Sequence, residues 1–230
     1  MSTIGSYGNF CGIARAFEIL GSSWSALLVR DLLLGSKTVE GLQESMPRLP
    51  EDQMWARLDE LEGAGVVQRA ADAGDEAVFE LTDYGKDLEP ILLQIGRWGA
   101  RSLGDPRPGD LLSLDMAILA LRATFRPEEA RGVHATFEVW FGPLVVNARV
   151  DDGELIVEPG ELPDADLVIA SPVLKHLMAA ELSPTDALWL GLADTKGDPR
   201  LVNTFVRLFH IPPPPEQQPA LGLASGRTAV

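Results

Sequence analysis

The 230-residue sequence is short of several residue types that build particular kinds of site. It has a single cysteine, Cys11, so no intramolecular disulfide can form. Its only three histidines are His134, His176 and His210, and they lack the short spacing typical of metal ligands. No glycine-rich phosphate loop or nucleophile elbow is present either. We therefore predict no metal site, no cofactor and no recognisable catalytic motif.

Basic residues and long apolar runs are also scarce. Nineteen Lys and Arg residues stand against 34 Asp and Glu residues, for a net charge of −15. Up to Gly104 there are 9 basic and 16 acidic residues, and after it 10 and 18, so neither half is attractive to a polyanion. No segment approaches the roughly 20 apolar residues that cross a bilayer, and the N-terminus lacks signal-peptide features. We expect a cytoplasmic protein with no membrane partner.

Proline and glycine indicate how the chain is divided. The segment GDPRPGD, residues 104–110, has the composition of an interdomain linker. The C-terminal segment from Pro212 opens with four prolines and continues without apolar periodicity, which is typical of an extended and then disordered tail. We therefore predict one domain over residues 1–103, a linker over 104–110, a second domain over 111–211 and a tail over 212–230.

The first domain has the pattern of a winged helix. Apolar residues recur at helical spacing over residues 13–20, 24–33 and 50–61, with a shorter helix predicted over 39–46 and ended by PRLP. Two β-rich runs, VVQRA and AVFELT, follow and are separated by the turn-forming DAGDE. A last helix is predicted from Thr82 to about Leu103. Helices followed by a hairpin indicate a winged helix-turn-helix.

The second domain has the pattern of an α+β fold. It opens with the helical LLSLDMAILALRATF, and apolar alternation then predicts strands in HATFEVWFG, PLVVNARVDDG, ELIVEPG and ADLVIAS. We expect these strands to form a meander sheet. Helical patterns in PVLKHLMAAEL, LSPTDALWLGL and DPRLVNTFVRLF predict helices that cover one face of it. The fold class predicted for the whole chain is α+β.

Specific segments resemble known families. Residues 7–103, through CGIARAFEILGSSWSALLVRDLLLG, ARLDELEGAGVV and FELTDYGKDLEPILLQIGRWGARSL, resemble HxlR-type winged-helix transcriptional regulators. The remainder, through ALRATFRPEEARGVHATFEV and VDDGELIVEPGELPDADLVI, resembles sterol-carrier-like domains attached to some of these regulators. The resemblance implies a homodimer built on the N-terminal helix and the helix from Thr82. It also implies DNA contact through the helix near Pro50 and the wing, and a cavity for a hydrophobic small molecule.

The chain departs from that family where DNA would be read. The recognition helix opens with Glu51, Asp52 and Gln53, and Trp55 and Arg57 follow, where small polar residues would approach the bases. Further departures are Ser23 and the segment from Ser36 to Val39. In the wing, the single basic residue Arg69 is outnumbered by the acidic residues Asp72, Asp75 and Glu76. The acids on the helix also stabilise its positive end, by about 0.3–1 kcal/mol each, with or without DNA. We therefore expect DNA binding to be weakened or lost.

Aromatic residues are the candidates for a ligand site. Trp24 and Trp98 fall on core positions of the family, and we expect them to pack inside the protein. The residues that we predict to line a hydrophobic-ligand space are Trp55, Phe137, Val139, Trp140, Phe141, Met178 and Trp189. We expect Trp55 to project from the reading face. Because side chains alternate along a strand, Phe137, Val139 and Phe141 share one sheet face and Trp140 lies on the other, so the face that lines the cavity is open.

The role of Cys11 has two possible interpretations. It occupies a position where the family often carries a sensor thiol, although Gly12 replaces the usual proline and Arg15, one turn on, is the nearest basic residue. The alternative is a small buried residue in a dimerisation helix.

Three functions remain open at this stage. The first is an enzyme on the regulator scaffold, cyclase- or isomerase-like, that acts on a hydrophobic metabolite, for example in secondary metabolism. A ligand-responsive DNA-binding regulator is the near-equal alternative. The third is a carrier, or a partner that titrates a true regulator through mixed dimers. The lost DNA-contact residues favour the first.

Overall fold

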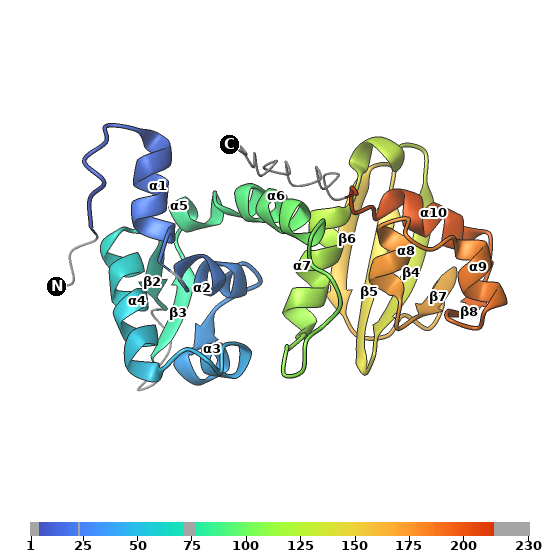
Figure 1. Ribbon diagram of the computed structural model, residues 1–230, viewed down its shortest axis with the longest axis horizontal. Helices are drawn as coiled ribbons and strands as arrows, with labels where there is room; N and C mark the ends of the chain where they lie inside the picture. Colours follow the sequence, from blue (N-terminus) through green and yellow to red (C-terminus); the bar gives the residue numbers. More distant parts are fainter. Residues whose placement is uncertain (1–4, 23, 71–76, 214–230) are drawn as a thin grey trace, which may run out of the picture.

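The structure is a computed structural model that describes residues 5–22, 24–70 and 77–213. Its helices and strands form two bodies side by side along the long axis, joined through a central helix (Figure 1). Ser23, the wing residues Asp72, Asp75 and Glu76, and the predicted tail from residue 214 lie outside the described residues.

The N-terminal body is a winged helix-turn-helix. Its elements are α1 (Gly12–Leu20), α2 (Ser25–Leu32), β1 (Lys37–Thr38), α3 (Val39–Ser45), α4 (Glu51–Gly63), β2 (Val67–Arg69) and β3 (Val78–Leu81). The four predicted helices and both predicted strands are confirmed. The two-residue β1 was not predicted, because so short a strand carries no alternation; it pairs with β3 to give the order β1-β3-β2.

Periodic apolar residues explain why these helices stay folded. Met54, Leu58 and Leu61 lie on one face of α4 and are fully buried, and α4 packs against α2, α3 and β2. Thr38 caps α3, since its Oγ1 accepts a hydrogen bond from the Gly41 amide at 3.0 Å. The buried face of α4 and the side-chain cap at the N-terminus of α3 therefore both stabilise the helix-turn-helix.

The helix predicted from Thr82 to Leu103 is divided in two. The structure has a short α5 (Asp83–Lys86) and then α6 (Glu89–Ala100), with Pro90 in the first turn of α6. Thr82 caps α5 by accepting from the Gly85 amide. Proline has no amide hydrogen to bond back to the preceding turn, so a continuous helix could not run through residue 90. The single-helix prediction was wrong at this point.

The C-terminal body contains helices and one five-stranded sheet. Its elements are α7 (Leu114–Thr124), the 3-10 turn η1 (Pro127–Glu129), β4 (His134–Phe141), β5 (Leu144–Asp151), β6 (Glu154–Pro159), β7 (Leu167–Ala170), α8 (Leu174–Met178), α9 (Pro184–Trp189), β8 (Asp194–Gly197) and α10 (Leu201–Leu208).

The sheet is only partly a meander, which corrects the expected topology. Its order is β6-β5-β4-β7-β8, so β7 returns beside β4 and runs parallel to it, and β8 was not predicted. The crossing segment 160–166 is tied to β4. The Leu162 amide donates to Glu138 Oε2 at 2.7 Å, and the Thr136 amide donates to Asp166 Oδ2 at 2.8 Å. These long-range bonds place β7 next to β4.

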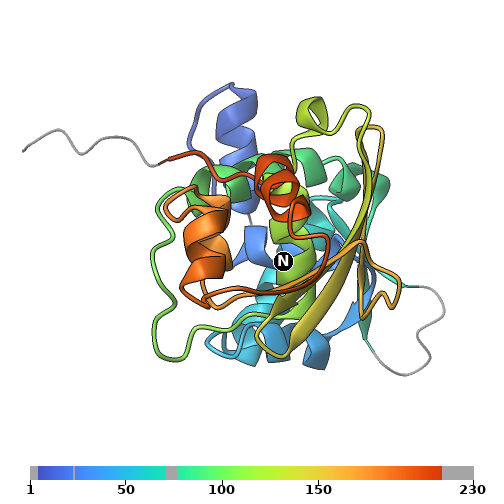
Figure 2. The same ribbon diagram turned by 90° about the vertical axis from the view of Figure 1, so that its right-hand side faces the viewer.

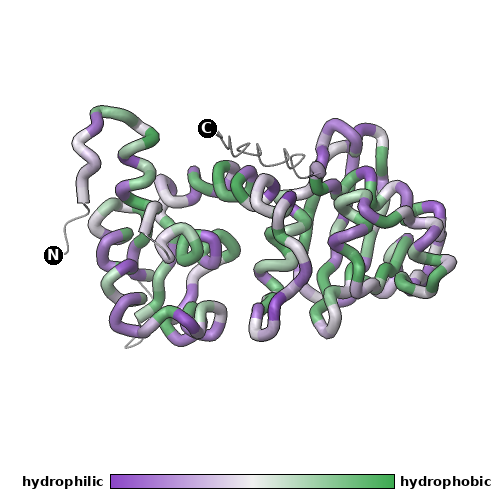
Figure 3. Tube along the Cα trace, in the orientation of Figure 1, coloured by the Kyte–Doolittle hydropathy of each residue, from purple (hydrophilic) through white to green (hydrophobic). Residues whose placement is uncertain are grey.

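One face of this sheet carries the core. Phe137 and Val139 on β4, with Val146 and Ala148 opposite them on β5, are fully buried. Helices α7, α8 and α10 contribute to the same apolar cluster, and they lie on one side of the sheet (Figure 2). In β4 the apolar Ala135, Phe137 and Val139 alternate with the polar His134, Thr136 and Glu138. Figure 3 shows both hydrophobic and hydrophilic positions in the C-terminal body. The prediction of an α+β body with helices on one sheet face is confirmed.

Candidate nucleic-acid interface and apolar surface

The exposed end of α4 is acidic. Pro50 precedes the helix, and Glu51, Asp52 and Gln53 in its first turn are all exposed. The next residue, Met54, turns into the core and is fully buried. In DNA-binding helix-turn-helix proteins the first residues of the recognition helix approach the base edges, and here two carboxylates occupy those positions.

Trp55 does not project from the reading face, which corrects the prediction. Its ring is half-buried and meets Phe79 of β3 edge to face, with ring centroids 5.9 Å apart. Its Nε1 donates to Glu51 Oε1 at 3.4 Å. The guanidinium carbon of Arg69 lies 5.0 Å from the centre of the Phe79 ring and 5.8 Å from that of Trp55. Trp55 therefore closes the edge of the core and shares Arg69 with Phe79.

Arg57 on α4 and Arg69 on β2 face carboxylates. Arg57 Nη1 lies 2.5 Å from Glu60 Oε2, and Arg69 lies 3.6 Å from both Asp59 and Glu62 on α4. Ion pairs at the protein surface contribute only about 0–1 kcal/mol each to stability, so they do not hold the arginines rigidly. What they show is that positive charge beside the reading helix is balanced within the protein, and phosphate groups would have to compete for it.

The same balance extends over the whole N-terminal body. Six of its nine Lys and Arg residues are in ion pairs with Asp or Glu: Arg15, Arg30, Lys37, Arg57, Arg69 and Lys86. Binding to DNA depends on cations that replace the counterions of phosphate. The described part of this surface offers few that are not already beside a carboxylate.

The predicted ligand-lining residues lie in separate places. Phe137, Val139 and Met178 are buried in the C-terminal core, where the Phe137 ring packs 5.5 Å from that of Phe205. Phe141 is half-buried at the edge of the same core. That part of the core is filled by aromatic rings, and the idea that these residues line a ligand space stays a prediction.

Two of the predicted tryptophans lie elsewhere on the C-terminal body. Trp140 is on the opposite sheet face from Phe137, and its Nε1 donates to the buried Glu138 at 2.8 Å. Trp189, at the end of α9, is 83% exposed. The structure therefore does not bring Trp55, Trp140 and Trp189 together.

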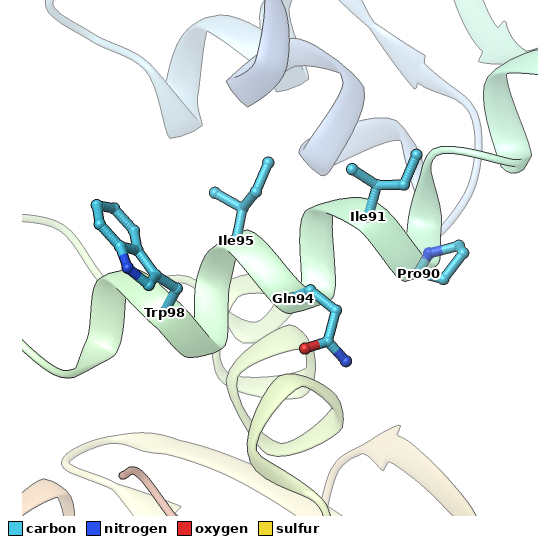
Figure 4. A pocket seen from close by; sticks show the side chains of 5 residues that line it. All are labelled: Pro90, Ile91, Gln94, Ile95 and Trp98. Carbon is cyan, nitrogen blue, oxygen red and sulfur yellow. The ribbon is translucent and has the colours of Figure 1, made fainter. Parts of the chain in front are cut away.

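The largest unexpected feature is an apolar face on α6. Pro90, Ile91, Gln94, Ile95 and Trp98 line a shallow hollow of about 480 Å³ along this helix (Figure 4). Trp98 is 70% exposed, so the prediction that it packs in the core was wrong for the single chain. The spacing of residues 91, 95 and 98 did signal an apolar helix face, but periodicity cannot distinguish a face that packs internally from one that awaits a partner.

A second exposed apolar strip lies at the start of the chain. Phe10, Ile13 and Phe17, on α1 and just before it, are exposed by 60% or more. None of the residues of α1 or α6 is buried within the chain. Soluble chains rarely leave two amphipathic helices uncovered in this way.

Cys11 is exposed and directly precedes α1. The amide of Ala14, and then that of Ile13, donate to its sulfur and lower the pKa of the thiol. The alternative, that Cys11 is buried in a dimerisation helix, concerns the assembled dimer and stays a prediction.

The described residues meet neither the requirements of a metal site nor those of a membrane-spanning helix. Among the described residues, no His, Cys, Asp and Glu side chains gather in a group that could hold a metal ion. Over the same residues, no helix is both long and apolar enough to span a bilayer.

Comparison with known proteins identifies the N-terminal body. The family model of HxlR-like helix-turn-helix proteins matches residues 19–106. The uncharacterized HTH-type transcriptional regulator YvaP of Bacillus subtilis is 38% identical over 86 residues, which are 36% of this chain and 80% of YvaP. The chain belongs to the HxlR-like helix-turn-helix family. The HxlR-like match ends before α7, so helices α7 to α10 and their sheet lie outside it.

Other HxlR-like relatives are more distant. The HTH-type transcriptional regulator YodB of B. subtilis is 27% identical over 97 residues, 41% of this chain and 84% of YodB. The structure of quinone-bound YodB has 26% identity, covers 38% of this chain and 93% of that one, and gives a TM-score of 0.34. The redox regulator HypR in its reduced form has 25% identity, 41% and 95% coverage, and a TM-score of 0.38.

Proposed function

We propose that this HxlR-like chain is a homodimer that binds a hydrophobic small molecule and has only weak affinity for DNA. The observation that carries the proposal is the charge around α4. Two exposed carboxylates open the reading helix, and Arg57 on this helix and Arg69 beside it are each paired with carboxylates.

The electrostatic consequence can be stated in terms of salt. Each phosphate that a protein neutralises steepens the dependence of log K on log salt by about 0.9. A domain that brings Glu51 and Asp52 toward the groove neutralises few phosphates, so it gains little affinity from counterion release. Its two carboxylates also repel the phosphates. We expect affinities no stronger than those of non-specific binders, with Kd of about 10⁻⁶ M or weaker at physiological salt.

Fluorescence anisotropy with duplex DNA from the upstream region of its own gene tests this, with titrations from 50 to 200 mM salt. The informative variant is Asp59→Asn with Glu62→Gln, which frees Arg69. The matched control is Glu161→Gln with Asp164→Asn, which removes the same charge from the exposed segment 160–166 of the C-terminal body. We expect the first variant to bind several-fold more tightly than the control. A wild-type Kd in the range of specific regulators, about 10⁻⁸–10⁻¹¹ M, would contradict the proposal.

The homodimer is supported by the apolar surfaces of α1 and α6. In a two-fold dimer the same patch on both copies meets, so one uncovered helix face can be closed by its own symmetry mate. Ile91, Ile95 and Trp98 form such a face, and α1 adds Ile13 and Phe17. A partner copy would also roof the hollow on α6, converting it into an enclosed apolar space.

For the hydrophobic ligand, two locations have support. One is this hollow on α6. The other is the C-terminal body, which we propose to be a sterol-carrier-like domain over residues 111–211, because helices cover only one face of its sheet and its core is continuous. Binding of an apolar dye such as anilinonaphthalene sulfonate, compared between Trp98→Ala and Met178→Ala variants, would separate the two. The cyclase- or isomerase-like role stays a prediction, and turnover of a hydrophobic metabolite is its test.

A second candidate function, thiol-based sensing, is favoured by the environment of Cys11. The sulfur is exposed, its pKa is lowered by two backbone amides, and it adjoins the apolar residue Phe10 on the proposed dimer surface. Modification of this thiol would place a new group within the interface. A Cys11→Ser variant should keep its dimer affinity after treatment with an oxidant or electrophile, whereas the wild type should lose part of it.

A further inference from the structure

Residues 109–115, which connect the two bodies and begin α7, hold cations of the helix-turn-helix. Lys37 Nζ lies 2.6 Å from Asp115 Oδ2, and both side chains are only about a quarter exposed. Arg48 Nη2 donates to the carbonyl oxygen of Gly109 at 3.4 Å. In Figure 1 the segment before α7 extends down to the level of α3.

Lys37 and Arg48 both lie beside the helices of the helix-turn-helix motif. Lys37 lies in β1, two residues before the start of α3, and Arg48 lies in the turn between α3 and α4. In helix-turn-helix proteins the first helix of the motif crosses the phosphate backbone while the second enters the groove. Contacts to phosphate position the protein and supply most of its non-specific affinity. Lys37 and Arg48 therefore bracket the part of the domain where phosphate would lie.

We propose that residues 109–115 form an autoinhibitory latch that withholds Lys37 and Arg48 from DNA. The proposal rests on the proposed function, since it offers a cause for weak affinity that is reversible, in addition to the fixed acids of α4. When the latch is closed, the Asp115 carboxylate is paired with the Lys37 ammonium group and adds negative charge beside α3. When it opens, two cations become available to phosphate.

The latch is rooted in the C-terminal core. On one face of α7, Ala117, Ile118 and Leu121 are buried in that core. Near the end of α7, Arg122 is paired with Glu89 of α6. Helices α6 and α7 pack closely, and a Cβ built on Gly96 would lie 3.6 Å from Ala123. A change that shifts α7 relative to the N-terminal body, such as a ligand in the C-terminal body, would therefore move Asp115 relative to Lys37.

The strength of the contact suits a switch. Partly exposed ion pairs are weak and are screened by salt, so opening requires no unfolding. A ligand needs only a small preference for the open arrangement to change its population.

Asp115→Asn in the full chain is the direct test. Its matched control is Asp194→Asn, which removes an equal charge from an exposed position on β8, at the end of the molecule away from the N-terminal body (Figure 1). Two measurements are made on each protein. One is the salt dependence of binding to a duplex DNA; the other is the rate at which an N-hydroxysuccinimide ester labels Lys37, followed by mass spectrometry without DNA.

We expect Asp115→Asn to label faster at Lys37 than the wild type and to bind DNA about fivefold more tightly at 50 mM salt, with a slope steeper by about 0.9. Asp194→Asn should match the wild type in labelling and slope. An Asp115→Glu variant keeps the charge and should restore the closed behaviour, which excludes a folding defect as the cause.

The outcomes are separable. If Asp115→Asn and Asp194→Asn behave alike in both measurements, or if labelling rises while DNA binding does not, the latch proposal is wrong. Tight binding by the wild type itself would instead refute the proposed weak affinity. The latch is judged only by the difference between the two asparagine variants.

Discussion

Replacing Trp98 by alanine should dissociate the dimer. Trp98 is 70% exposed on α6 and forms one end of the apolar hollow that Pro90 and Ile91 close at the other. Within the chain its removal disturbs little, because so much of the indole already faces solvent. In a two-fold dimer both copies of the indole would be covered, so the change affects the interface twice.

The size of the effect follows from the exposed area. A buried tryptophan covers about 150–250 Å², so covering the exposed 70% removes roughly 100–175 Å² from water. At about 25 cal/mol per Å² this contributes about 2.5–4.4 kcal/mol for each protomer, as an upper estimate. Alanine recovers part of that area, and ordering the side chain has its own cost. We expect the dimer Kd to rise by at least about a hundredfold, which corresponds to about 2.7 kcal/mol.

Sedimentation velocity over a range of protein concentrations measures this shift. Trp189→Ala is the matched control, since it removes an indole that is 83% exposed on α9, far from α6 along the molecule (Figure 1). The control should dimerise like the wild type. If Trp98→Ala stays as dimeric as the wild type, or if Trp189→Ala dissociates equally, α6 is not the interface and the interpretation of its exposed face fails.

Three further predictions concern the thiol, the core and a helix cap. Because the pKa of Cys11 is lowered, its thiolate forms at lower pH, and the rate of iodoacetamide alkylation should reach half its maximum at lower pH than in the urea-unfolded chain; equal midpoints would refute this. Phe137→Ala should reduce the free energy of unfolding in urea by about 3–5 kcal/mol, whereas Ile156→Ala, on the open sheet face, should cost less than about 1 kcal/mol. Thr38→Ala should cost about 1 kcal/mol by the same measurement, and Thr38→Ser should recover most of it.

Local sequence patterns were sufficient for most helices and strands, and for the acidic character of α4. The apolar period of Met54, Leu58 and Leu61 predicted both a helix and its buried face, because packing of a helix depends on residues one turn apart. Pro50, which suits the first turn of a helix, placed Glu51 and Asp52 at the start of α4, and the resemblance to HxlR-type regulators implied that this end reads DNA. Pro90 could have predicted the break between α5 and α6, since it removes a helical hydrogen bond.

What the sequence determined by itself is therefore the set of elements, the excess of acid over base and the carboxylates at the start of the recognition helix. Only the tertiary structure decided that β7 lies beside β4, that Trp55 packs inward while Trp98 stays exposed, and that Asp115 reaches Lys37. The contacts among these features join residues far apart in the chain, and the exposure of Trp98 reflects the lack of such a contact within the chain. Periodicity reports which face of an element is apolar or charged, and it carries no information on which distant surface that face meets.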